Sequence, residues 1–179
     1  MGPTQVNGLP AHILLVHFVI VMVPLAALLT VLSAVWPAAR RRLGVLTPLV
    51  ALAALITVPV ATHAGEWLKQ RVHLTPLILR HTSLGHELLP WAIGIFLVAA
   101  AQWAYFHWYV KDPAESRTDG VAGEAAPRTN ASAGTAVTIV FAALAVIASV
   151  GAVAEVYRIG ESGSKAVWSG SFSQTPRTN

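Results

Sequence analysis

The residues "HILLVHFVIVMVPLAALLTVLSAVW", 12–36, decide which kind of fold this chain can adopt. The stretch contains no Asp, Glu, Lys or Arg. It is also longer than the about 20 residues that an α-helix needs to cross a hydrocarbon core of about 30 Å. An uncharged apolar run of this length is typical of a transmembrane helix. It predicts that the chain begins its fold with a span across a lipid bilayer.

Three further apolar stretches follow, at about 43–64, 88–110 and 135–156. Their length and their Ala- and Leu-rich composition favour helices, because unpaired backbone groups cannot be left in lipid. A β-barrel would require shorter segments of alternating polarity, which the chain lacks. The sequence therefore predicts an all-α integral membrane four-helix bundle, formed as a single domain by residues 1–170.

The composition points to a lipid bilayer as the main partner. Of the 179 residues, 55% are hydrophobic and 11% are charged, whereas soluble domains carry roughly 25% charged residues. The twelve Lys and Arg residues are spread along the chain and form no basic face, which argues against nucleic acid binding. The chain has no cysteine, so disulfides, thiolate metal sites and thioether-linked heme are excluded.

The segments between the spans differ in character. Residues 111–134 are rich in Gly, Ala, Ser and Pro and predict a disordered polar loop between the third and fourth helices. Residues 66–86 are less polar and are expected to lie along the bilayer surface. Residues 171–179 predict a flexible tail.

The orientation follows from the basic residues next to the first span. Lys and Arg residues are equally numerous on the two sides. However, Arg40, Arg41 and Arg42 directly follow the first span, and the first helix usually dominates the topology. We therefore expect both termini on the extracytoplasmic side.

Histidines gather at one end of the predicted bundle. In four alternating spans, the beginnings of spans one and three lie beside the ends of spans two and four. Counting about 20 residues from each cytoplasmic end predicts four side chains at one depth, one from each helix: His17, His63, His86 and Glu155. The next turn outward, about 5.4 Å away, would hold His12, His81 and Glu66.

Two of the predicted helices carry paired histidines five residues apart, His12 with His17 and His81 with His86. Five residues turn a helix by about 140° beyond a full turn, so the members of one pair cannot easily bind the same ion. We expect one member of each pair to face the bundle and the other to face a neighbour, water or lipid.

A histidine cluster among four helices suits a b-type heme, which needs two axial histidines, an apolar slot and cations near its propionates. The predicted ligands are His17, His63 and His86, followed by His12 and His81, with Arg80 and Arg158 near the propionates. The corresponding function is electron transfer. Two alternatives stay open. One is a Zn, Cu or Fe site, with this expected ligand set: His17, His63, His86, Glu66 and Glu155. The other is a ligand-free structural subunit of a membrane complex.

Other activities find little support in the sequence. It has no recognisable nucleophile triad and no phosphate-binding loop. Transport is disfavoured because the middles of all four spans lack charged residues. We expect a binding or electron-transfer protein, not a catalyst in its own right, with a redox partner or a second copy of itself as a protein partner.

Three motifs carry a resemblance to a known family: "LPAHILLVHF" at 9–18, "THAGEWL" at 62–68 and "RIGESGSKAVWSG" at 158–170. The chain resembles the bacterial membrane family catalogued as domain of unknown function 2231. The matching positions are His12, His17, His63, Gly65, Glu66, His81 or His86, Arg158, Gly160, Ser162 and Gly163. The sequence departs from the family pattern at Ile13 and Val19, where the family often has proline, and at Glu161, where it often has histidine. The resemblance implies a four-helix integral membrane protein of a bacterial family that is suspected of binding heme or metal and of redox partnership. It supplies no established activity.

Overall fold

A computed structural model describes residues 4–109 and 129–171, with side chains from residue 134 onward in the second range. A two-residue antiparallel hairpin with an Asn7–Gly8 turn precedes the helices. The described elements are β1 (Gln5–Val6), β2 (Leu9–Pro10), α1 (Ala11–Val35), α2 (Pro37–Leu43), α3 (Leu46–Lys69), α4 (Pro76–Trp108) and α5 (Thr129–Trp168).

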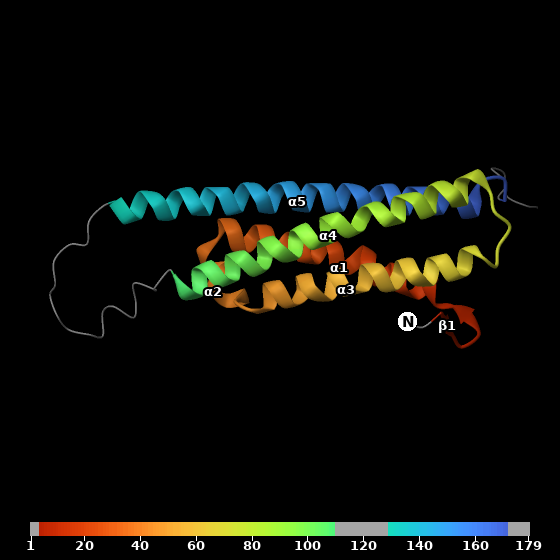
Figure 1. Ribbon diagram of the computed structural model, residues 1–179, viewed down its shortest axis with the longest axis horizontal. Helices are drawn as coiled ribbons and strands as arrows, with labels where there is room; N and C mark the ends of the chain where they lie inside the picture. Colours follow the sequence, from red (N-terminus) through yellow and green to blue (C-terminus); the bar gives the residue numbers. More distant parts are fainter. Residues whose placement is uncertain (1–3, 110–128, 172–179) are drawn as a thin grey trace, which may run out of the picture.

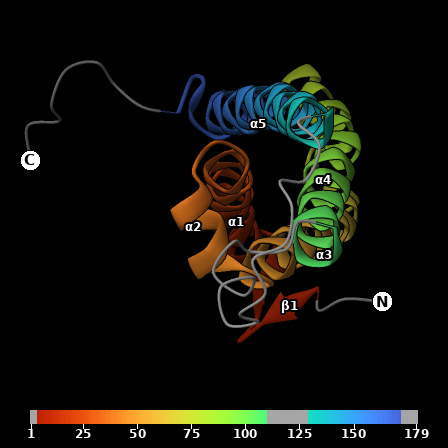
Figure 2. The ribbon, with the colours of Figure 1, turned by 90° about the vertical axis from the view of Figure 1, so that its left-hand side faces the viewer.

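The four long helices form one bundle and run side by side along its longest axis (Figure 1). Helix α1 packs on α3 and α5, and α4 packs on the same two helices, so α1 and α4 lie diagonally opposite each other (Figure 2). Each of the four is long and apolar enough to cross a membrane. The predicted all-α four-helix membrane bundle is confirmed.

The packing of the bundle is that of a protein surrounded by lipid. Its interior consists largely of small side chains, such as Ala26, Ala54 and Ala99. In lipid the hydrophobic effect does not drive helices together, and small residues let them approach closely enough for strong van der Waals packing. Large apolar side chains, including Phe18 and Leu97, face outward. Such an extended apolar surface would be unstable in water. The chain is therefore a multi-pass membrane protein.

The segment expected on the bilayer surface belongs instead to two helices of the bundle. Helix α3 continues to Lys69 and α4 begins at Pro76, so only residues 70–75 link them. The start of α4 has a local cause: the hydroxyl of Thr75 accepts a hydrogen bond from the backbone N–H of Ile78 (3.3 Å), and proline is favoured at the first helical position. This extension places His81 on a helix that is packed against α5.

The last helix is also longer than its predicted span. Helix α5 begins at Thr129, so residues 129–134 are helical and not part of a loop. It ends at Trp168, which places the residues of the 158–170 motif up to Trp168 on a helix. The other residues of the predicted loop, and most of the predicted tail, lie outside the described residues.

Helix α2 marks the end of the bundle that lies opposite the histidines. Trp36 has an extended backbone before Pro37, which breaks the helix after α1. Arg40 of α2 then places its guanidinium 3.5 Å from the ring centre of Phe106 on α4. This cation–π contact links α2, the short basic helix between α1 and α3, to α4.

A few buried polar side chains link the helices inside the apolar interior. The hydroxyls of Ser33 on α1 and Thr47 on α3 lie 2.9 Å apart. Ser149 on α5 donates a hydrogen bond to the carbonyl of Ala27 on α1 (3.2 Å). The amide of Gln102 on α4 is buried and finds no hydrogen-bond partner among the described residues. Such polar contacts supplement the packing of small residues between membrane helices.

Candidate functional site

The histidines near one end of the bundle fall into two groups. His12 and His81 are partly buried, whereas His17, His63 and His86 are exposed. The expected division within each pair is confirmed, because one member of each faces inward. The inward members are His12 and His81. The sequence favours His17 and His86 ahead of them as ligands, on the basis of their depth in the membrane.

The ring of His12 lies against the neighbouring helix α3. Its Nδ1 lies 3.0 Å from the carbonyl oxygen of Ala61, so this nitrogen carries the proton and donates. A Cβ atom at Gly65 would lie only 2.9 Å from Cε1 of His12. Glycine therefore provides the space for the ring. With Nδ1 donating, Nε2 keeps its lone pair and can bind a metal ion.

The ring of His81 is held in the same way by α5. Its Nδ1 lies 3.2 Å from the carbonyl oxygen of Ile159 and 3.0 Å from the hydroxyl oxygen of Ser162. A Cβ atom at Gly163 would lie 3.0 Å from Cε1 of His81. Each ring is thus fixed by a backbone carbonyl and a glycine of the next helix, which again leaves Nε2 free to accept or to ligate.

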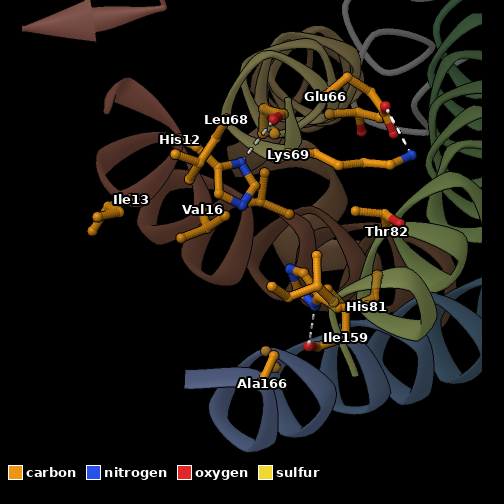
Figure 3. A pocket seen from close by; sticks show the side chains of 18 of the residues that line it. His12, Ile13, Val16, Glu66, Leu68, Lys69, His81, Thr82, Ile159 and Ala166 are labelled. Carbon is orange, nitrogen blue, oxygen red and sulfur yellow. Dashed lines mark hydrogen bonds and ion pairs between the residues drawn. The ribbon is translucent and has the colours of Figure 1, made fainter. Parts of the chain in front are cut away.

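The two rings face each other across the bundle from diagonally opposite helices. Their centroids are 6.3 Å apart and their planes are inclined by 75°. Figure 3 shows that the nitrogens not bonded to the backbone point toward the space between the rings. A cavity of about 460 Å³ surrounds this space, and its walls are mainly apolar. They include Val16, Val58, Ile78, Val156 and Ile159.

A small polar group lies at the rim of this cavity. Glu66 accepts from Lys69 (3.2 Å), and its other oxygen lies 3.3 Å from Nε2 of His86. Glu66 and Lys69 line the cavity, whereas His86 is 59% exposed at its side chain. His86 therefore contacts Glu66 at the surface and does not face the space between His12 and His81.

Helix α5 carries a second group of charges. Glu155 is only 4% exposed, and one of its oxygens accepts from Arg158 at 2.6 Å. The other oxygen is buried without a hydrogen-bond partner in the described part of the chain. Arg158 also lies 3.6 Å from Glu87 on α4. Arg158 is thus held between two carboxylates, and Arg80, the other cation predicted near the propionates, is exposed.

The predicted metal ligands are not gathered at one point. Nδ1 of His17 bonds to the carbonyl of Ile13 in its own helix (2.6 Å), and the His63 side chain is exposed. Of the predicted set, His86 and Glu66 are in contact, while Glu155 pairs with Arg158. Among residues 4–109 and 129–171, no group of three or more His, Cys, Asp or Glu side chains is placed to hold a metal ion.

The structure adds residues that the sequence reasoning did not assign to the site. Lys69 brings a cation to the cavity wall, and the carbonyls of Ala61 and Ile159 fix the two rings. Gly65 and Gly163 stood in the motifs but had no role there. Their size was a signal: each glycine gives its helix room for the ring of a histidine on the neighbouring helix.

The facing pair of imidazoles is the feature on which a functional argument can rest. Comparisons with protein-family models, with curated proteins and with solved structures found no match. The resemblance to the domain of unknown function 2231 family stays a prediction. The geometry of the site must therefore carry the argument by itself.

Proposed function

We propose that this protein binds a b-type heme through His12 and His81 and serves electron transfer in the membrane. The observation that carries the proposal is the pair of facing imidazoles, each with Nδ1–H bonded to a backbone carbonyl. Histidines that ligate metals almost always donate their other N–H in this manner, which fixes the ring and raises the basicity of the ligating nitrogen.

The separation of the rings fits two histidines that would hold one ion between them. A ligating histidine nitrogen lies about 2 Å from its metal ion, and the ring centre lies about 1 Å further out. Two imidazoles on opposite sides of one ion therefore have centroids about 6 Å apart, whereas two ligands of a tetrahedral ion have centroids about 5 Å apart. The distance of 6.3 Å between His12 and His81 matches the first arrangement.

The cavity has the properties that the macrocycle requires. Its volume of about 460 Å³ falls within the range of about 300–1,000 Å³ that is typical of ligand pockets. Its walls are mainly aliphatic, as an apolar ring system needs. For the propionates, Lys69 is better placed than Arg158, because Lys69 lines the cavity and Arg158 does not.

The residues of the chain would divide the work as follows. His12 and His81 would hold the iron, and the carbonyls of Ala61 and Ile159 keep both rings in place. The apolar walls would lower the polarity around the heme and thereby help to set its redox potential. A heme held by two histidines supplies reversible one-electron transfer. We place the protein in the bacterial cytoplasmic membrane with this end extracytoplasmic, where a redox partner exchanges the electron.

The heme content of the protein tests this function. We expect protein purified from heme-supplied cells to contain about one heme per chain and to show a Soret band that shifts on reduction. Protein from heme-depleted cells serves as the control. A stoichiometric divalent metal without heme would replace the proposal by the metal-site alternative. Neither heme nor metal would leave a structural subunit.

A further inference from the structure

The histidine cavity adjoins a second hollow between α1 and α5. This groove of about 620 Å³ runs along the outward side of the two helices. Its walls include Ile20 and Pro24 of α1 and Val153 and Tyr157 of α5. The residues that line both hollows are Ile20, Val156, Gly160 and Ser164. The groove therefore borders the cavity along the seam between α1 and α5.

The groove has an apolar part and a polar end. Ile20, Pro24 and Val153 form the apolar part, which lies nearer the middle of the helices along their length. Toward the histidine end, Ser164 offers a hydroxyl, and Glu161 pairs with Lys165 at 2.6 Å. Because this pair is close to neutral overall, the polar end favours a neutral head group with hydrogen-bond acceptors over an anionic phosphate.

We propose that the groove is the docking site of a lipophilic quinone that exchanges electrons with the heme; this rests on the proposed function. A quinone has a neutral ring with two carbonyl acceptors and an apolar tail. The ring suits the polar end beside Gly160, and the tail suits the surface formed by Pro24 and Val153. The shared wall brings the ring next to the His12–His81 cavity.

The electron balance of the exchange is simple. A quinol that becomes a quinone loses two electrons and two protons. One heme would accept a single electron from each quinol. Two of the semiquinones so formed disproportionate to one quinone and one quinol, so that one quinol would in sum reduce two heme-loaded chains. The two protons pass to water at the polar end of the groove.

A substitution in the groove alone separates docking from heme binding. Val153 lines the groove but not the histidine cavity, and its side chain is outward-facing. Val153→Trp should fill the groove and leave His12 and His81 untouched. The matched control is Val150→Trp, one turn away on the same helix, where the outward-facing side chain lines neither hollow.

The experiment measures binding of decylubiquinone to each variant in phosphatidylcholine nanodiscs, and heme reduction by decylubiquinol in the heme-loaded protein. We expect Val153→Trp to weaken binding by about tenfold or more and to slow reduction by the quinol. Val150→Trp should behave as the unsubstituted protein. Dithionite should reduce the heme in both variants.

The outcomes separate this inference from the proposed function. Heme present and reducible by dithionite, with equal quinone binding by Val153→Trp and Val150→Trp or with no binding at all, overturns the docking site. So does a co-purified phospholipid, lost in Val153→Trp, in place of quinone. Quinone bound by the unsubstituted protein and lost in Val153→Trp, but with no heme in any sample, supports the docking site and overturns the proposed function.

Discussion

Replacement of His12 or His81 by alanine is expected to remove the heme from the purified protein. Each change deletes one of the two facing imidazoles and leaves a gap next to Gly65 or Gly163. We expect the ratio of heme to protein to fall to about a tenth or less, since loss of a ligand or of its supporting contacts commonly costs tenfold to hundredfold in affinity. Absorbance at the Soret band and a total heme assay measure the ratio.

Two controls on exposed histidines complete this test. His17→Ala and His63→Ala remove imidazoles that face outward and should keep the heme content of the unsubstituted protein. Size-exclusion chromatography in detergent checks that all variants remain folded. The assignment is wrong if His12→Ala and His81→Ala keep their heme while His17→Ala and His63→Ala lose it. The ligands would then be those ranked first from the sequence.

The second large effect concerns the packing of α4 on α5. A Cβ atom at Gly151 would overlap the Trp91 ring, so the two cannot occupy their present positions together. Gly151→Ala therefore forces the indole out of the interface between the two helices. We expect a loss of about 1–3 kcal/mol from such overpacking, reduced by the helix propensity that alanine gains over glycine, about 1 kcal/mol.

Gly94→Ala is the matched control for this prediction. Gly94 lies on α4 in the same interface, but its Cβ atom would be 3.8 Å from that of Ala148, an ordinary contact. Thermal unfolding in detergent should show a lower Tm for Gly151→Ala and an unchanged or higher Tm for Gly94→Ala. Trp91→Leu should relieve most of the loss in a double-mutant cycle. Equal effects of the two glycine substitutions would contradict the close contact of Trp91 with α5.

The membrane fold could be predicted because lipid leaves few choices. The uncharged run at 12–36 is long enough to cross the bilayer, and a helix there satisfies all of its backbone hydrogen-bonding groups. The ends of the helices were harder to predict. The composition of residues 66–86 fits both a surface segment and an extension of the helices. The extension forms because Thr75 caps α4 and Pro76 occupies its first position.

The inward-facing histidines were only half predictable. The five-residue spacing shows that His12 and His17 point in different directions, as do His81 and His86. Which member faces inward depends on the rotation of the helix about its axis. In α1 this rotation leaves no sequence signal, because apolar residues surround the whole helix. Contacts between helices fix it, among them the fit of His12 against Gly65.

The role of Arg158 could have been read more fully from the sequence. Glu155 and Arg158 are three residues apart, a spacing that places opposite charges side by side on a helix. The additional contact of Arg158 with Glu87 depends on the packing of α4 against α5 and has no local signal. Arg158 therefore seemed available for a propionate when depth alone was considered.

The most direct test of the facing pair is electron paramagnetic resonance of the ferric, heme-loaded protein. A heme iron that His12 and His81 both held would be low-spin. Because the planes of His12 and His81 are inclined by 75°, we expect the strongly anisotropic low-spin signal that nearly perpendicular imidazoles produce. A high-spin signal from a five-coordinate iron, or a low-spin signal that survives in His12→Ala and His81→Ala, would show that these two side chains do not hold the heme together.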